Sequence, residues 1–242
     1  MILNLLKKIR RYWYRLTHPV IGEVWQLHRV TDEQSVQERV RDYEITPACL
    51  ESLIVEYQRK GYEFISMAEV AERMKGKDGK KFVAATLDDG YANNYELAYP
   101  IFKKYDVPFC IYVCKGMITG ERREDNIEHY KMLSIDQLRA LDKDPLCTLG
   151  GHTNSHVRLT ALSKEQQMQE IYGCKLWLEN MLGQKVEDYA FPYGDYNAQT
   201  LSILRELGIT RAVASWGGGV RRNTPERILD IPRILITETD KQ

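Results

Sequence analysis

The sequence has no excess charge of either sign and contains few cysteines. Its 242 residues include 34 lysines and arginines against 34 aspartates and glutamates, so the formal net charge is zero. A nucleic-acid-binding domain usually has a basic excess, and we therefore predict no nucleic acid as a partner. The five cysteines are irregularly spaced and form no C-x-x-C pair. This argues against a zinc ribbon or a thioredoxin-type site and favours buried free thiols in a reducing compartment.

The chain also lacks a long uninterrupted apolar run near its start. The stretch MILNLLKKIRRYWYRLTHPV is broken by Asn4, Lys7 and Lys8, so it resembles neither a signal peptide nor a membrane span. Apolar residues at helical spacing between basic ones predict a basic amphipathic helix within residues 1–20. Residues 1–18 could bind an anionic membrane surface, or the helix could pack on its own domain with a solvated basic face. We expect a cytoplasmic protein, and membrane binding by residues 1–18 would place it peripherally on the inner face of the membrane.

Strands and helices alternate along the remainder of the chain, without an internal repeat or a low-complexity linker. The predicted strands lie at 23–30, 62–66, 80–90, 107–114, 146–152, 188–192, 210–215 and 227–236, and the predicted helices at 47–61, 67–76, 91–105, 134–142, 163–182 and 198–208. This alternation predicts one α/β domain over residues 21–242, built on a parallel sheet or barrel. In such folds the functional site lies at the carboxyl ends of the strands.

Polar residues follow several of the predicted strands. In TLDDG, Asp88 and Asp89 are adjacent and precede Gly90, which allows a sharp turn. Neighbouring residues of an extended segment point to opposite sides, so the two carboxylates can take different roles. A surface turn is the ordinary explanation of this pattern when it stands alone.

The stretch GGHTNSH places His152 and His156 four residues apart. It is not the H-E-x-x-H pattern of zincins, because Thr153 replaces the glutamate. Two imidazoles and one carboxylate are a common ligand set for a divalent metal that keeps an open position for water, and Asp89 is the natural third ligand. Asp88 would then be the spare base. A polar loop is the alternative for the two histidines taken by themselves.

Three motifs together resemble those of a known family. TLDDG resembles the T-F-D-D-G motif of the polysaccharide deacetylase family, which comprises metal-dependent N-deacetylases related to chitin oligosaccharide deacetylases. GGHTNSH is similar to the H-[ST]-x-x-H motif, and AFPYGDYN to the third motif of that family. The resemblance extends from about residue 23 to residue 236. It implies a distorted (β/α) barrel of about seven parallel strands, preceded here by the basic N-terminal helix.

The resemblance also implies roles for individual residues. Asp88 would be the general base, and Asp89, His152 and His156 would hold the metal. Pro192 and Tyr193 would lie on the substrate side, with the Tyr193 backbone N–H helping to bind the oxyanion. The implied reaction is the hydrolysis of an N-acetyl group on an amino sugar of a polysaccharide or glycan precursor, such as that of a capsule or cell-surface polymer.

This chain departs from the family pattern at two positions, and another residue would have to take over the role of each missing one. Many members have an arginine two residues before the proline of the third motif, where this chain has Ala190, and Arg233 is our candidate for the missing cation. Many members also end in a Leu-x-His motif that provides the general acid, but the last predicted strand contains no histidine. His28 is our candidate acid, because closing a barrel brings the first and last strands together and some members place this histidine on the first strand. A core histidine bonded to backbone is the alternative.

Some assignments remain open at this stage. Trp216 is either an aromatic wall for a sugar ring or a core tryptophan at a strand end. Zinc is the leading metal, but cobalt, manganese, nickel and iron accept the same ligands. The alternatives to an N-deacetylase are a hydrolase of another C–N amide on the same fold and a catalytically inactive relative that binds sugar or associates with a membrane.

Overall fold

The computed structural model describes residues 17–32, 41–121 and 130–238. The predicted amphipathic helix lies almost entirely outside these residues, so the division at residue 20 stays a prediction. Within the described part, no helix combines the length and the apolar character needed to cross a bilayer.

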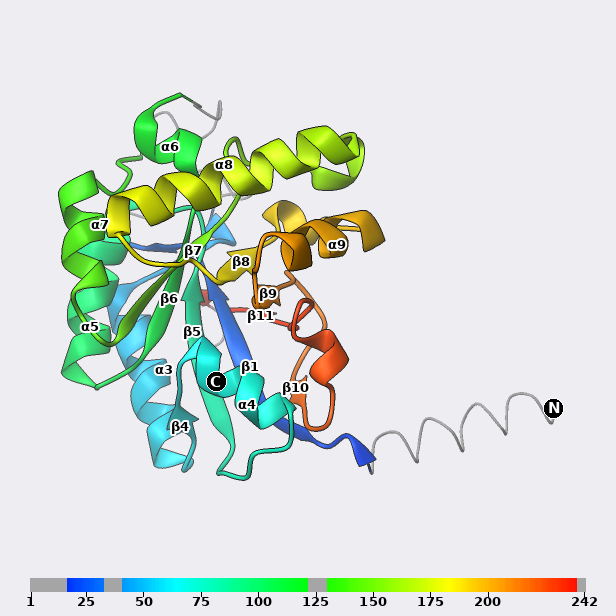
Figure 1. Ribbon diagram of the computed structural model, residues 1–242. Helices are drawn as coiled ribbons and strands as arrows, with labels where there is room; N and C mark the ends of the chain where they lie inside the picture. Colours follow the sequence, from blue (N-terminus) through cyan, green and yellow to red (C-terminus); the bar gives the residue numbers. More distant parts are fainter. Residues whose placement is uncertain (1–16, 33–40, 122–129, 239–242) are drawn as a thin grey trace.

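A curled, mostly parallel sheet forms the centre of the molecule (Figure 1). Its strand order is β10-β1-β5-β6-β7-β8-β9, and β11 also pairs with β1. The strands are β1 (Val20–Leu27), β4 (Glu63–Phe64), β5 (Phe82–Leu87), β6 (Phe109–Val113), β7 (Cys147–Gly151), β8 (Asp188–Ala190), β9 (Arg211–Val213), β10 (Val220–Arg221) and β11 (Ile234–Leu235). A separate small sheet pairs β2 (Arg29–Val30) with β3 (Glu44–Ile45).

The chain segment after β9 closes the sheet into a distorted barrel. Ile231 forms a parallel bridge with Val213 of β9, and Ile234 and Leu235 then pair in parallel with Trp25 and Gln26 of β1. The distorted (β/α) barrel of about seven strands implied by the resemblance is therefore confirmed, with a sheet that is mostly parallel. The predicted last strand at 227–236 is much shorter than expected, because its two ends pair with different strands. The antiparallel β10 was not predicted.

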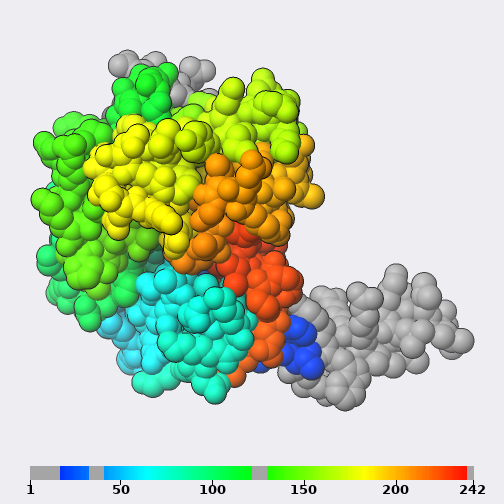
Figure 2. All heavy atoms as spheres, in the orientation of Figure 1, coloured from blue at the N-terminus to red at the C-terminus, as the bar shows by residue number. Residues whose placement is uncertain are grey.

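Helices cover the outside of the barrel, and Figure 2 shows α4, α8 and α9 on one face. The helices are α3 (Pro47–Arg59), α4 (Met67–Met74), α5 (Tyr99–Lys104), α6 (Lys115–Thr119), α7 (Ile135–Asp142), α8 (Lys164–Leu182) and α9 (Ala198–Glu206), with a π-helix η1 at Asn94–Ala98 and short turns η2 (Leu159–Ala161), η3 (Pro192–Gly194) and η4 (Pro225–Arg227). Local signals set their ends: Ser163 caps α8 reciprocally with Gln166, and left-handed Gly183 ends it.

Alternation along the strands separates an inner core from an outer one. Trp25 and Leu27 of β1 belong to the large cluster that packs under the helices. Val24, by contrast, belongs to a smaller cluster with Ala84 of β5 and Tyr112 of β6. Because side chains alternate with a period of two, Gln26, Thr86 and Asp88 continue the inner row towards the carboxyl ends of β1 and β5. The barrel interior thus changes from apolar to polar at that end.

Candidate metal and hydrolytic site

Three predicted ligands meet at the carboxyl ends of β5 and β7. Nε2 of His152 lies 3.5 Å and Nε2 of His156 lies 3.3 Å from Oδ1 of Asp89. One ligand atom from each residue lies within 4.8 Å of the others, the only such cluster among the described residues. Oδ1 of Asp89 is buried and accepts no hydrogen bond from the part of the chain that the structure describes. A buried carboxylate oxygen facing two imidazole nitrogens fits a divalent cation, whose charge would compensate it.

The backbone directs His152 towards this cluster. Its Nδ1 lies 2.8 Å from the carbonyl oxygen of Ala190, and because a carbonyl can only accept, Nδ1 carries the proton and Nε2 offers its lone pair. Burial lowers the pKa of His152 to about 4, against the opposing charge of Asp88. The imidazole is therefore neutral near pH 7, as metal binding requires.

Left-handed backbone conformations gather at the site. Asp89 (φ 73°), Thr153 (67°), His156 (50°) and Tyr193 (58°) are four of the six non-glycine residues with positive φ in the described chain. Local hydrogen bonds support two of them: the His156 N–H donates to Thr153 Oγ1 at 2.8 Å, and the Cys114 N–H to Asp89 O at 3.4 Å. Such conformations cost free energy, and their concentration here indicates that the fold holds these side chains in place for function.

Asp88 lies beside the cluster and is held by Arg233. Nη1 and Nη2 of Arg233 each donate at 2.7 Å, to Oδ1 and Oδ2 of the carboxylate respectively. The guanidinium is fully buried and also bonds Ala214 O and Thr86 Oγ1. Burial raises the pKa of Asp88, but the charge of Arg233 and its hydrogen bonds outweigh burial and bring the pKa well below its ordinary value. The carboxylate is thus ionised, and Arg233, our candidate for the missing cation, lies against it.

His28 follows β1 and lies near the same carboxylate. Its Nε2 is 3.9 Å from Oδ2 of Asp88, and its side chain is 13% exposed. The Asn94 amide donates to the His28 carbonyl at 2.7 Å, and the ring meets Tyr43 edge-on. Burial lowers the pKa of His28, with the charge of Asp88 opposing it. A lower pKa makes the imidazolium a stronger acid and reduces its population at neutral pH.

The remaining predicted residues form the rim. The Tyr193 ring lies 4.7 Å from the His156 ring, and Pro192 beside it is buried. Trp216 is 61% exposed, so the core alternative for this residue is wrong. Gly194 allows the Trp216 indole to approach, because a Cβ there would lie 3.0 Å from its ring. The Trp216 indole is therefore open to a ligand, whereas Tyr193 is 40% exposed and its ring already has the Arg158 guanidinium 4.5 Å from its centre.

Sequence reasoning missed two polar residues of the site. Gln26 Nε2 lies 3.2 Å from Oδ2 of Asp88, and Thr86 Oγ1 accepts from Arg233 at 3.0 Å. Both are buried in the inner row of the barrel. The signal was present in WQLHRV, where Gln26 shares a strand face with His28.

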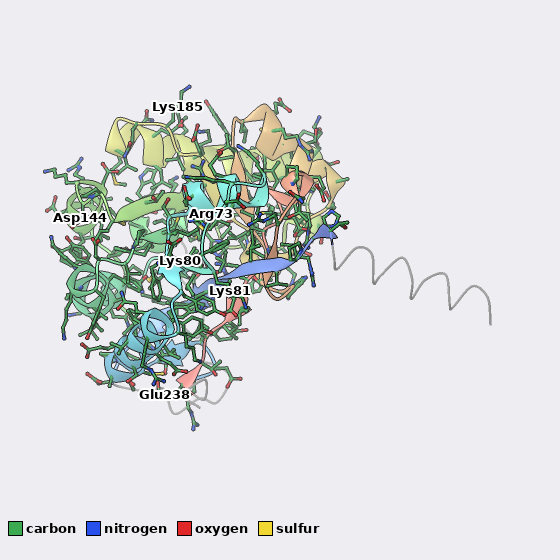
Figure 3. The ribbon with its side chains drawn as sticks, turned by 90° about the horizontal axis from the view of Figure 1, so that it is seen from below. Arg73, Lys80, Lys81, Asp144, Lys185 and Glu238 are labelled. Atoms are coloured by element: carbon green, nitrogen blue, oxygen red, sulfur yellow. The ribbon has the colours of Figure 1, made fainter. Side chains whose placement is uncertain are left out.

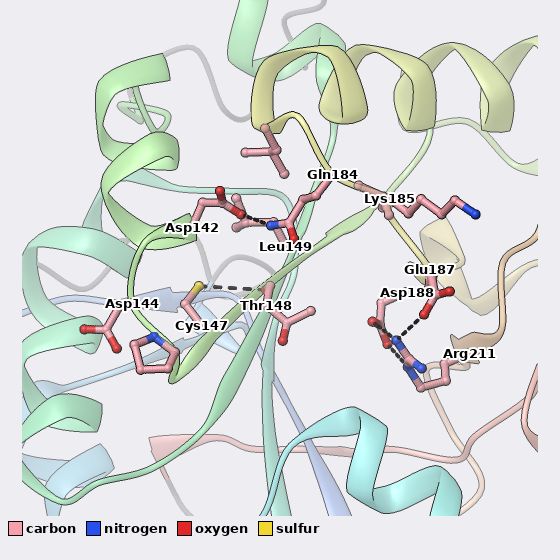
Figure 4. Close-up of a pocket in the computed structure, with 13 residues that line it drawn as sticks. Asp142, Asp144, Cys147, Thr148, Leu149, Gln184, Lys185, Glu187, Asp188 and Arg211 are labelled. Carbon is pink, nitrogen blue, oxygen red and sulfur yellow. Dashed lines mark hydrogen bonds and ion pairs between the residues drawn. The ribbon is translucent and has the colours of Figure 1, made fainter.

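The amino ends of the strands carry a different polar region. A cavity there is lined by Asp142, Asp144, Pro145, Cys147, Thr148, Leu149, Leu182, Gln184, Lys185, Val186, Glu187, Asp188 and Arg211. Figure 4 shows Arg211 hydrogen-bonded to Asp188 and paired with Glu187. Viewed from below, Arg73, Lys80 and Lys81 lie together near the start of β5, away from Asp144 and Lys185 (Figure 3). None of our predicted site residues lines this cavity.

The fold and the cluster define a class: an α/β-barrel protein with three residues able to hold a metal at the carboxyl ends of its strands. Comparison with known proteins identifies the family. The family model for polysaccharide deacetylases matches residues 75–212, more than half of the chain. The chain therefore belongs to the polysaccharide deacetylase family.

Individual relatives agree with this assignment. The chain is 26% identical over 213 residues to the poly-beta-1,6-N-acetyl-D-glucosamine N-deacetylase of Staphylococcus aureus, with 84% of this chain and 71% of the relative covered. The Streptococcus pyogenes deacetylase PplD in complex with acetate superposes with a TM-score of 0.77 at 25% identity, over 91% of this chain and 94% of that chain. IcaB from Ammonifex degensii has a TM-score of 0.76 at 24% identity, over 90% and 92% of the chains, and supports the fold alone.

Proposed function

We propose that this protein is a metal-dependent carbohydrate N-deacetylase, which hydrolyses the N-acetyl group of an amino sugar within a polysaccharide or a glycan precursor. The observation that carries the proposal is the combination of the Asp89–His152–His156 cluster with a second, unligated carboxylate at Asp88. Two adjacent aspartates serve two roles here, because one faces the imidazoles and the other faces Arg233.

Asp89, His152 and His156 would hold one divalent metal, which supplies Lewis acidity towards an acetyl carbonyl and a lowered pKa for water. Zinc suits this ligand set best, with cobalt, manganese, nickel and iron as alternatives. Asp88, kept ionised by Arg233, accepts the proton of the attacking water. The backbone N–H of Tyr193 donates to the developing oxyanion.

The leaving amine needs a proton, because an amide anion is a very poor leaving group. His28 is the proposed donor, since it is the imidazole near Asp88 that does not belong to the ligand cluster. The missing arginine and terminal histidine were the reasons to consider an inactive relative. The positions of Arg233 and His28 beside Asp88 remove much of that support.

The substrate class follows from the relatives and from the rim. The Staphylococcus aureus relative is named for poly-beta-1,6-N-acetyl-D-glucosamine, so oligomers of that polymer and other precursors of capsule or cell-surface polysaccharides are the substrates to test. Exposed Trp216 and Tyr193 would stack on sugar rings. We also propose that residues 1–18 bind an anionic membrane surface from the cytoplasmic side, which liposome co-sedimentation with and without these residues tests.

The deciding experiment measures free acetate. Purified protein loaded with zinc, and separately with cobalt or manganese, is incubated with N-acetylglucosamine oligomers and with acetylated non-sugar amides. Acetate release from the sugars, abolished by a chelator and restored by metal, is the expected result. Release from the non-sugar amides alone would support the alternative that the protein hydrolyses another C–N amide. No release from any compound would support the alternative that it is a catalytically inactive relative.

A further inference from the structure

Gln26 is a buried polar residue of the site to which the reaction described above gives no role. It lies on β1, two residues before His28, and is only 5% exposed. Its Nε2 donates one hydrogen to Oδ2 of Asp88 at 3.2 Å and the other to Oγ of Ser215 at 3.3 Å. A buried amide is costly unless it is hydrogen-bonded, so a glutamine in the barrel interior needs these partners.

The bonds of Asp88 make its two oxygen atoms different. Oδ2 accepts from Nη2 of Arg233 at 2.7 Å and from Gln26 at 3.2 Å. Among the described residues, the side chain that donates to Oδ1 is Arg233, through Nη1 and also at 2.7 Å. A carboxylate oxygen has two lone-pair sites, so the side chains fill both sites on Oδ2 and one of the two on Oδ1. His28 Nε2, at 3.9 Å from Oδ2, is beyond hydrogen-bond distance.

We propose that Gln26 is a positioning residue that fixes the carboxylate of Asp88 and reserves Oδ1 as the atom that takes the proton from water. This inference rests on the proposed hydrolysis. An O–H bond of the attacking water breaks, its proton moves to Oδ1, and the electron pair remains on the water oxygen that attacks the acetyl carbon. Without Gln26, the second site on Oδ2 is open, and water can orient itself on the wrong oxygen.

The location of Gln26 suits this role. Its backbone carbonyl accepts from the Ile236 N–H at 3.0 Å, at the junction where β1 meets the returning chain. Its side chain links Asp88, which directly follows β5, to Ser215, the residue before Trp216. One amide therefore ties the base to the part of the rim proposed to contact the sugar, and the barrel closure holds it in place.

The test compares two buried glutamines. Gln26→Met keeps the side-chain length and removes both hydrogen bonds. Gln167→Met is the matched control, because Gln167 on α8 is fully buried and its side chain also makes two hydrogen bonds: Nε2 donates to Leu162 O, and Oε1 accepts from Thr200 Oγ1. We expect Gln26→Met to lower kcat about tenfold, with KM and metal content unchanged, as for loss of a hydrogen bond to a charged group. Gln167→Met should lower Tm and leave kcat unchanged.

A second variant separates positioning from packing. In Gln26→Glu, the new carboxyl group can donate to Oδ2 only while it is protonated, so the ratio of its kcat to that of wild type should fall as pH rises. A purely structural role would give a ratio that does not change with pH. Unchanged kcat in Gln26→Met overturns this inference alone. A wild-type protein that releases no acetate overturns the proposed function and this inference with it.

Discussion

Two aspartate–arginine pairs lie at opposite ends of the barrel. At the carboxyl ends, Arg233 grips Asp88 with two bonds of 2.7 Å. At the amino ends, Arg211 grips Asp188 with two bonds of 2.8 Å (Figure 4). Both aspartates are almost fully buried. The local chemistry of the two pairs is nearly the same, so the pair itself does not define a catalytic base.

The surroundings distinguish the two pairs. Asp88 has Gln26 and His28 as further neighbours, and the residue after it belongs to the metal cluster. The neighbour of the second pair is Glu187, whose carboxylate lies 3.4 Å from Arg211. In barrels of this kind the carboxyl ends carry the chemistry and the amino ends carry stability. We therefore assign a functional role to the first pair and a structural role to the second.

The largest expected difference between the two pairs is in the effect on kcat of replacing the aspartate by asparagine. Asp88→Asn removes the base and should lower kcat about 1000-fold, and it should also lower Tm, because the fully buried Arg233 loses its charged partner. Asp188→Asn should leave kcat within twofold but lower the free energy of unfolding by about 2 kcal/mol, because the half-buried Arg211 loses its nearest carboxylate and keeps Glu187 at 3.4 Å. Acetate release and urea unfolding measure the two effects. Equal losses of activity in both variants would contradict the division.

The next largest effect is expected at His28, which lies beside the Asp88–Arg233 pair and has no counterpart among the described residues beside Asp188 and Arg211. His28→Ala should lower kcat about 100-fold by removing the proton donor. Added imidazole should restore part of the rate, which loss of packing alone would not allow. Asn94→Ala tests how far the acid depends on the bond to its carbonyl. A full rate in His28→Ala would transfer the acid role to water.

Substitution of the two arginines should give a smaller difference in kcat than substitution of the aspartates or of His28. Arg233→Lys keeps the charge but loses the planar fork, and we expect kcat to fall by about 10- to 100-fold. Arg211→Lys makes the same change at the other end and should alter stability without altering kcat. Steady-state kinetics of the two variants under identical metal loading provides the comparison. A fall in kcat for Arg211→Lys would mean that the amino end influences the site.

The smallest effect is a pH dependence at the amino end. The Tyr99 hydroxyl, the Leu146 N–H and Lys103 lower the pKa of Asp144 from 3.8 to about 2. A lowered pKa in the folded state stabilises the protein above pH 3.8, and this contribution is lost as pH falls towards 2. Tm of wild type should therefore exceed that of Asp144→Asn at pH 5, and the difference should shrink towards pH 2. A constant difference would mean that Asp144 does not titrate as described.

Local sequence determined most of the elements, because their signals lie within a few residues. Thr46 and Pro47 mark the start of α3, and the apolar run 107–114 predicts the buried strand β6. The last strand was predicted too long, since no local signal reveals that residues 227–236 divide their pairing between β9 and β1. The exposure of Trp216 was equally hidden, because a tryptophan at a strand end fits a core as well as a rim.

The sequence alone determined which residues could hold a metal, because Asp89, His152 and His156 carry the ligand atoms and lie in short motifs at strand ends. Only the tertiary structure decided how Asp88 is held. Its partner Arg233 is 145 residues away in the chain and Gln26 is 62 residues away. Barrel closure brings these three side chains together, and such long-range contacts depend on the pairing of whole strands, which no short stretch of sequence encodes.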